Sequence, residues 1–130
     1  MPKLLIIDDD EQIRELVGSI LESDYDISLT ASLDEAEAFL TEHSRQIGVV
    51  LSDMCLPDPK STVSRVTGWQ TQYPGLETVF VSGLPAVAVR TDFGLINGVN
   101  FLSKPFTVSE LRQIVAEASA RFGTRLEQAA

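Results

Sequence analysis

Five side chains suited to phosphate and metal chemistry follow or end short apolar segments. Asp8 and Asp9 follow the first segment, and Asp53 ends the third. Ser82 and Lys104 end the fourth and the fifth. Three carboxylates brought together repel one another unless protons or a cation neutralise them. Mg²⁺ suits such a set because it prefers carboxylate, water and phosphate oxygens. The sequence therefore predicts a Mg²⁺ site at which Lys104 and Ser82 help to hold an oxygen-rich anion.

Asp53 is the candidate nucleophile. A carboxylate at the end of an otherwise apolar strand is costly unless it is paired or metal-bound. Carboxylates are recognised nucleophiles that form acyl phosphates. Phosphoryl transfer depends mainly on positioning and on neutralisation of charge. We therefore expect Asp53 to attack a phosphoryl group, Lys104 to neutralise its charge and Ser82 to hydrogen-bond the product.

Strand-like segments alternate with helical ones along the chain. The segment 47–53 is a near-continuous apolar run, typical of a strand buried on both faces of a parallel sheet. Tyr25, Ile27 and Leu29 instead alternate with polar residues, which indicates a half-exposed edge strand. Strands are expected at 3–7, 25–30, 47–53, 78–82 and 99–103. Helices are expected where apolar stripes cover 13–21, 33–40 and 108–122, with another from about 62 to 73 and a short or irregular one within 85–97.

Such β-α alternation predicts a parallel sheet with helices on both faces and right-handed crossovers. We expect an α/β, flavodoxin-like, doubly wound (βα)₅ fold with strand order 2-1-3-4-5, whose ligands bind at the carboxyl ends of the strands. Asp10 should cap the first helix. Capping boxes at 32–35 and 107–110 should begin two others, and Arg14 should lie on a solvated helix face.

Length, charge and cysteine content limit the class of protein. A chain of 130 residues suits one domain, expected over 1–122 with 123–130 as a C-terminal tail or the start of a linker. The net charge of −9 argues against a nucleic-acid or anionic-membrane partner. The single cysteine, Cys55, excludes an internal disulfide. We expect no signal peptide and no membrane span, hence a cytoplasmic protein, as a monomer or weak dimer.

Four motifs in order resemble those of the response-regulator receiver domain of two-component signalling, from about residue 3 to residue 122. Asp8-Asp9 resembles the family's acidic pair, Asp53-Met54-Cys55-Leu56-Pro57 its phosphoacceptor turn, Ser82-Gly83 its Ser/Thr–small-residue step and Lys104-Pro105-Phe106 its Lys-Pro-Phe. The separations of 44 positions from Asp9 to Asp53 and 22 from Ser82 to Lys104 are also close to the family's usual values.

The resemblance implies a role for each landmark. Asp53 would accept a phosphoryl group from the phosphohistidine of a histidine kinase or histidine phosphotransfer domain. Asp9, Asp53 and the Cys55 carbonyl would bind Mg²⁺, with Asp8 helping through water. Lys104 would contact the phosphoryl group, and the bond that follows it, to Pro105, would be cis.

The resemblance also implies a switch and a setting for its lifetime. Ser82 and Phe101 would be the family's coupled switch pair, the aromatic ring turning inward as Ser82 moves toward the phosphoryl group. Positions two after the phosphoacceptor and two after the switch serine tune dephosphorylation, and here they hold Cys55 and Leu84. Neither side chain orients an attacking water as Asn, Gln or Glu would. We therefore predict a comparatively long-lived aspartyl phosphate.

Two segments depart from the family pattern. Lys60-Ser61 stands where the family usually has an acid or amide followed by glycine, and the irregular segment 85–97 covers the usual signalling helix. Ser82-Gly83-Leu84, together with residues 98–102, resembles the terminal receivers of hybrid sensor histidine kinases.

Two alternative functions stay open. A phosphatase of the haloacid-dehalogenase type also uses a strand-end aspartate and Mg²⁺, but its Asp-x-Asp motif and cap domain fit residues 8–11 and this length poorly. A pseudo-receiver would only dock a partner, although its usual hallmark is loss of an acid or of the lysine. We expect a receiver that catalyses its own phosphorylation and dephosphorylation, not a turnover enzyme.

Overall fold

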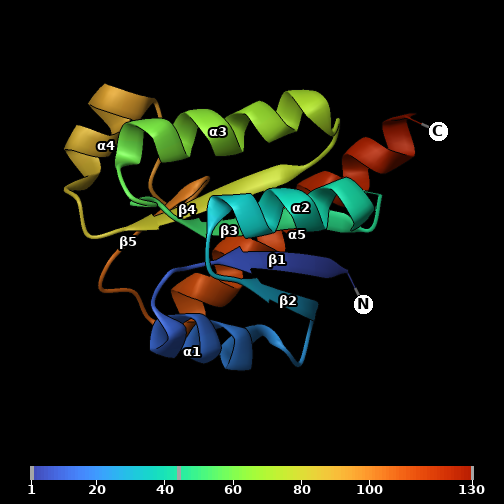
Figure 1. Cartoon of the computed structure of the whole chain (residues 1–130), viewed down its shortest axis with the longest axis horizontal. Coiled ribbons are helices and arrows are strands. Elements are labelled where there is room, and N and C mark those ends of the chain that lie inside the picture. Colours follow the sequence, from blue (N-terminus) through green and yellow to red (C-terminus); the bar gives the residue numbers. More distant parts are fainter. Residues whose placement is uncertain (1, 44, 130) are drawn as a thin grey trace.

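A parallel sheet of five strands separates two layers of helices (Figure 1). The structure is a computed structural model that describes residues 2–43 and 45–129, with side chains as far as Gly123. The strand order is β2-β1-β3-β4-β5, so the predicted fold and strand order are confirmed. In chain order the elements are β1 Lys3–Ile7, α1 Glu11–Leu21, β2 Asp26–Thr30, α2 Leu33–His43, β3 Ile47–Asp53, α3 Pro59–Gln72, β4 Glu77–Ser82, α4 Ala86–Phe93, β5 Phe101–Ser103 and α5 Val108–Ala129.

Each face of the sheet packs its own layer of helices. Successive side chains of a strand point to opposite faces, so Leu5 and Ile7 of β1 join one apolar cluster and Leu4 and Ile6 join the other. The first cluster contains the inner residues of α2, α3 and α4, and the second those of α1 and α5. The sheet is therefore buried on both sides, which explains the continuous apolar run of β3.

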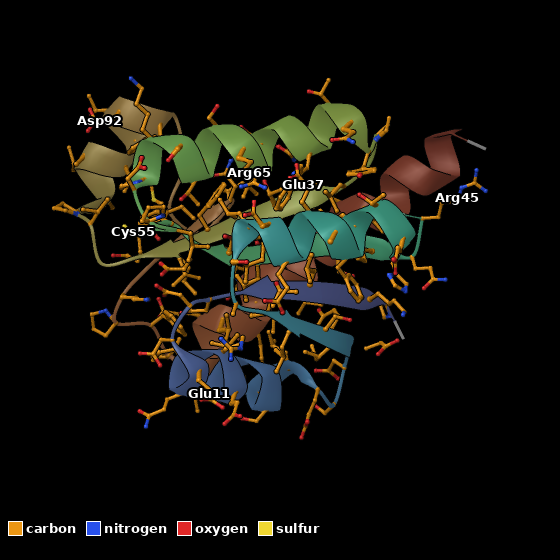
Figure 2. All side chains as sticks on the ribbon, in the orientation of Figure 1. Glu11, Glu37, Arg45, Cys55, Arg65 and Asp92 are labelled. Carbon is orange, nitrogen blue, oxygen red and sulfur yellow. The ribbon has the colours of Figure 1, made fainter. Side chains whose placement is uncertain are left out.

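A polar network joins α2 to α3. Arg65 on α3 lies 2.6 Å from Asp34 Oδ1 and 2.5 Å from Glu37 Oε2, both on α2; Figure 2 shows Arg65 and Glu37 between the two helices. The indole of Trp69, only 2% exposed, donates to Glu37 Oε1 at 3.3 Å. Hydrogen bonds from Arg65 and then Trp69 lower the pKa of Glu37 below its usual value. The network fixes how α3 lies against α2.

The predicted helix starts are confirmed by their caps. The Asp10 carboxylate accepts hydrogen bonds from the amides two and three positions on, at 2.9 and 3.2 Å. The Ser32 hydroxyl accepts from the Glu35 amide at 3.1 Å. Thr107 and Glu110 exchange side-chain to backbone bonds of 2.9 and 3.0 Å. These caps set where the chain turns from each loop into a helix.

The start of α3 differs from the prediction. The helix begins at Pro59 and not near Thr62. Asp58 caps it, because its Oδ1 accepts from the Ser61 amide at 2.9 Å. Proline suits the first turn of a helix, where its missing N–H leaves no bond unmade. Pro57 and Pro59 therefore lie on either side of the capping residue, Asp58.

Other details of the elements also differ from the prediction. β5 is shorter than predicted, beginning at Phe101. β2 is an edge strand as predicted, but Leu29 is 41% exposed whereas Thr30 is buried and donates to the Ile6 carbonyl at 3.0 Å. The predicted tail 123–130 is helical as far as Ala129, and residue 130 lies outside the described residues.

Among the described residues, no helix is both long and apolar enough to cross a bilayer.

Gly48 leaves room for the C-terminal half of α5. A Cβ atom at Gly48 would lie 2.6 Å from Cδ2 of Phe122. We expect Gly48→Ala to lower the free energy of unfolding by about 1–3 kcal/mol, because the ring must shift out of its packed position. Urea unfolding followed by circular dichroism measures this loss. In a Phe122→Ala background the same change should cost little.

Gly68 provides the matched control. It lies within α3, and a Cβ atom there meets nothing within 4 Å among the described residues. Gly68→Ala should therefore be neutral or stabilising, since alanine favours a helix over glycine. Equal costs for Gly48→Ala with and without the Phe122 ring would contradict the proposed steric cause.

Candidate functional site

The strand registers bring the candidate residues to one edge of the sheet. β1 and β3 end their pairing one residue before Asp8 and Asp53. β4 and β5 end theirs at Ser82, one residue before Lys104. The Lys104 amide donates to the Ser82 carbonyl at 2.8 Å, which continues the ladder by one residue. The carboxyl ends of the central strands therefore lie side by side, as predicted.

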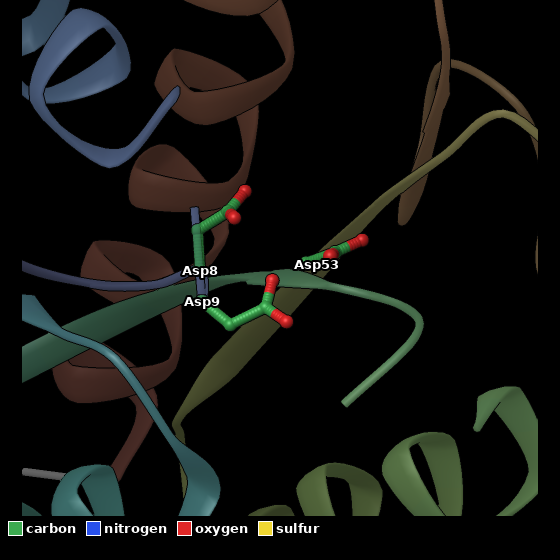
Figure 3. Close-up of side chains that lie close together, drawn as sticks. All are labelled: Asp8, Asp9 and Asp53. Atoms are coloured by element: carbon green, nitrogen blue, oxygen red, sulfur yellow. The ribbon is translucent and has the colours of Figure 1, made fainter. Parts of the chain in front are cut away.

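Three carboxylates meet at this edge. Asp8, Asp9 and Asp53 each offer one oxygen, and these oxygens lie within 4.8 Å of one another. Figure 3 shows the three side chains close together at the ends of two neighbouring strands. Asp8 is buried, Asp53 is half-buried and Asp9 is exposed. The cluster is therefore open to solvent on the Asp9 side and enclosed on the Asp8 side.

The loop after β1 is held by bonds to Asp8. The Asp8 amide donates to the Thr30 carbonyl at 3.1 Å, and its Oδ1 accepts from the Asp10 amide at 2.9 Å. Nη1 of Arg14 donates to the Asp8 carbonyl at 2.8 Å. The expectation that Arg14 is merely solvated is therefore wrong: its long side chain reaches back from α1 to the loop. These bonds fix where the Asp8 carboxylate points.

The electrostatics of the cluster oppose ionisation of Asp8. Burial raises the pKa of the Asp8 carboxyl above its usual value, and the charges of Asp53 and Asp9 raise it further. The Asp10 amide and the Lys104 ammonium lower the pKa but do not cancel the rise. A cation placed among the three carboxylates would remove this repulsion.

Lys104 supplies positive charge beside the acids. The side chain is half-buried and acts electrostatically on both Asp8 and the Cys55 thiol. Among the described residues, no carboxylate lies within ion-pair distance of its ammonium group. The ammonium is therefore available to an anion at the cluster. The bond to Pro105 is cis, as the resemblance implied.

The switch candidates Ser82 and Phe101 are both buried. Ser82 is buried, and its hydroxyl accepts from the Leu84 amide at 3.0 Å. Phe101 is fully buried in the cluster beneath α2, α3 and α4. Leu84 is half-buried and packs against that same cluster. All three therefore contact the site or the core beside it, and the aromatic ring already points inward.

The loop after β3 carries Cys55. Its amide lies 3.5 Å from Asp53 Oδ1, and the residue is exposed at the end of the sheet (Figure 2). Desolvation raises the pKa of the Cys55 thiol, and the Asp53 charge adds to the rise. The raised pKa keeps the thiol protonated at neutral pH. The bond between Leu56 and Pro57 is also cis, which the sequence did not lead us to expect.

Two residues of the site were not found from the sequence. Arg14 holds the loop that carries Asp8. Thr62, buried in the first turn of α3, accepts from the Leu56 amide at 2.9 Å and so holds the loop that carries Cys55. Both side chains bond to backbone groups. Nearly every residue has such groups, so the sequence does not indicate which of them a side chain will bind.

The side chains present fit a hard divalent cation. Three carboxylates offer the oxygen ligands that Mg²⁺ prefers. Burial, and after it the charges of Asp53 and Asp9, raise the pKa of Asp8, and a cation at the cluster would offset these effects. The set contains no imidazole, which would favour a softer metal.

Comparison with known proteins gives the same result from sequence and from structure. The family model described as "Response regulator receiver domain" matches residues 4–116. The chain is 32% identical over 129 residues to response regulator Rre1 of Synechocystis sp., covering 91% of this chain and 52% of that protein. It therefore spans about half the length of this curated relative.

Solved structures agree. A response regulator receiver domain protein from Clostridium thermocellum superposes with a TM-score of 0.81 at 23% identity, covering 95% of this chain and 98% of that one. The beryllofluoride-activated NtrC4 receiver domain, solved as a dimer, gives a TM-score of 0.77 at 26% identity, covering 94% and 99%. With the sheet order, the acidic cluster and the family match in agreement, the chain belongs to the response regulator receiver domains of two-component signalling.

Proposed function

We propose that this receiver domain accepts a phosphoryl group on Asp53 in a Mg²⁺-dependent reaction. The observation that carries the proposal is the convergence of Asp8, Asp9 and Asp53 within 4.8 Å at the strand ends, beside the ammonium of Lys104. Asp9, Asp53 and the Cys55 carbonyl would hold the ion, and Asp8 would act through water. The proposed donor is the phosphohistidine of a histidine kinase or histidine phosphotransfer domain.

The transfer exchanges one bond for another. An oxygen of Asp53 attacks phosphorus and forms the P–O bond of an aspartyl phosphate. The P–N bond of the donor breaks, and its electron pair returns to the imidazole nitrogen. Mg²⁺ held by Asp9, Asp53 and the Cys55 carbonyl would supply neutralisation of the negative charge on the phosphoryl group and on the acceptor carboxylate. Lys104 would stabilise negative charge on the transferring oxygens.

The proposed readout passes through Ser82 and Phe101. The Ser82 hydroxyl now accepts a hydrogen bond from the Leu84 amide. A new phosphoryl oxygen nearby would draw this hydroxyl away from that amide. This change would move the backbone after β4 and stabilise the inward position of the Phe101 ring. The switch would thereby reach α4, which follows Ser82 in the chain, and β5, which begins at Phe101.

A hollow beside Lys104 suits the protein that delivers the phosphoryl group. It has a volume of about 440 Å³ and is lined mainly by apolar residues of α1 and by Lys104, Pro105 and Phe106. Leu16, on its α1 wall, is 56% exposed. An apolar surface that includes Lys104 would let a donor helix bind while its phosphohistidine reaches Asp53.

The test is a mass measurement with a small phosphodonor. The protein is incubated with acetyl phosphate, with and without Mg²⁺, and its intact mass is recorded. We expect one added phosphoryl group in wild type with Mg²⁺, and none without Mg²⁺ or in Asp53→Asn. Beryllofluoride should bind under the same conditions and with the same dependence on Asp53. Absence of any adduct in wild type would favour the pseudo-receiver alternative, and continuous release of phosphate from phosphoesters would favour the phosphatase.

The lifetime of the aspartyl phosphate is a separate prediction. Leu84 is apolar and packed against the core, and the Cys55 thiol stays protonated, so neither positions water for attack. Cys55→Asn should shorten the lifetime by about tenfold or more, because a side-chain amide can orient the water. Cys55→Ala is the matched control and should match wild type. The decay of the phosphorylated mass after removal of donor measures this; decay in wild type as fast as in Cys55→Asn would contradict it.

A further inference from the structure

One buried hydroxyl joins the loop after β3 to the helix that follows. Thr62, in the first turn of α3, has an exposed fraction of 0%. Its Oγ1 accepts a hydrogen bond from the Leu56 amide at 2.9 Å and donates one to the Asp58 carbonyl at 2.7 Å. A single side chain therefore bonds to two backbone groups of the loop that carries Cys55.

The bond to Leu56 sets the orientation of one peptide group. The Leu56 N–H and the Cys55 C=O belong to the same peptide, which is planar and, among the described bonds, not one of the two that are cis. In a trans peptide the N–H and the C=O point in opposite directions. The Thr62 hydroxyl, by holding the N–H, therefore also directs the Cys55 carbonyl oxygen away from α3.

Other bonds restrain this peptide weakly. Among the described residues, no group donates a hydrogen bond to the Cys55 carbonyl. The amide of the preceding peptide, on Cys55, lies 3.5 Å from Asp53 Oδ1, at the outer limit for a hydrogen bond. Rotation of the plane would thus be opposed mainly by Thr62, whose own position is fixed by its backbone bond to the Asp58 carbonyl at 3.2 Å.

We propose that Thr62 is a positioning residue for the Mg²⁺ site, holding the Cys55 carbonyl in the orientation in which it binds the ion. This inference rests on the proposed Mg²⁺ site at Asp9 and Asp53. Mg²⁺ demands a nearly ideal octahedron of oxygen atoms, so a ligand carbonyl that rotates freely binds it less well. Groups that orient metal ligands commonly contribute one order of magnitude or more to affinity.

The test compares three variants by calorimetric titration with Mg²⁺. Thr62→Val keeps the shape but removes the hydroxyl, and it should weaken Mg²⁺ binding about tenfold. Thr62→Ser keeps the hydroxyl and should restore wild-type affinity. Thr67→Val is the matched control, because Thr67 lies on the same helix and donates to the carbonyl four residues earlier at 2.6 Å, but does not bond to the loop. It should bind Mg²⁺ as wild type does.

A second measurement needs no variant to fold. In wild type followed by nuclear magnetic resonance, the Leu56 amide should exchange slowly with solvent before Mg²⁺ is added, and the Cys55 carbonyl carbon should shift on its addition. Fast exchange at Leu56, or Thr62→Val with wild-type affinity, overturns the role of Thr62 alone. Failure of wild type to bind Mg²⁺, or undiminished binding by Asp53→Asn, overturns the site on which the inference rests.

Discussion

Lys104→Ala is expected to slow phosphorylation of Asp53 by acetyl phosphate by about 10²-fold or more, the size of effect seen when one group that stabilises transition-state charge is removed. The ammonium lies at the end of β5, close enough to act on Asp8, and among the described residues it is not engaged by a carboxylate. The transferring phosphoryl group would lose this positive charge. The rate at which the phosphorylated mass appears at saturating Mg²⁺ measures the effect.

The same variant should bind Mg²⁺ more tightly than wild type. Lys104 lowers the pKa of Asp8 through its positive charge, and a positive charge that stabilises the carboxylate also repels a cation. General damage to the site would weaken Mg²⁺ binding as well as slow the transfer. Slow transfer together with tighter Mg²⁺ binding therefore indicates loss of a transition-state contact. Lys60→Ala is the control, because Lys60 is an exposed lysine in the first turn of α3. A rate for Lys104→Ala equal to that of Lys60→Ala would contradict the assigned role.

Asp8→Asn is expected to raise the stability of the metal-free protein and to lower that of the Mg²⁺-bound protein. The pKa of Asp8 is raised in the folded state, mainly by burial. Its contribution to stability is therefore fully present below the usual value of 3.8 and is lost as the pH rises through the raised pKa. At neutral pH the ionised carboxylate destabilises the fold, and the neutral amide should raise the melting temperature by a few degrees, or about 1 kcal/mol.

With Mg²⁺ present, wild type should be more stable than Asp8→Asn. Wild type should gain stability from the ion, because a ligand that binds only the folded state stabilises it. Asp8→Asn should gain much less, with Mg²⁺ affinity lowered about 10–100-fold. Melting curves with and without Mg²⁺, at neutral pH and at pH 4, measure both effects. Asp92→Asn, on the exposed side of α4, is the control; a Mg²⁺ response in Asp8→Asn equal to that control would show that Asp8 takes no part.

The sheet and the position of its acids were predictable because they depend on strong, local signals. A strand buried on both faces needs a continuous apolar run, and 47–53 has one that ends on Asp53. Since parallel strands align their carboxyl ends, the adjacency of Asp8 and Asp53 follows from the predicted strand order 2-1-3-4-5, in which the first and third strands are neighbours. Helix caps were equally readable, because the side chain and the amide it binds lie within three residues of each other.

What escaped prediction depends on contacts that are distant in sequence or on the backbone. Thr30 is buried in place of Leu29 because its hydroxyl reaches the Ile6 carbonyl on the neighbouring strand. Arg14 turns back to the Asp8 carbonyl, although its spacing fits an exposed helix face. The Asp58-Pro59 start of α3 did carry a local signal, a capping acid followed by proline, but the neighbouring proline gave it the appearance of a loop.

Trp69 has a consequence for how this domain can be observed. It is the chain's only tryptophan, and it is buried between α2 and α3. It follows the first residue of α3 by ten positions, or about 15 Å along the helix axis, whereas the acids lie near that first turn. Its fluorescence should therefore report collapse or loss of the α2–α3 layer while remaining unchanged when Mg²⁺ fills the site. The emission intensity of Trp69 would therefore not distinguish Mg²⁺-bound protein from metal-free protein.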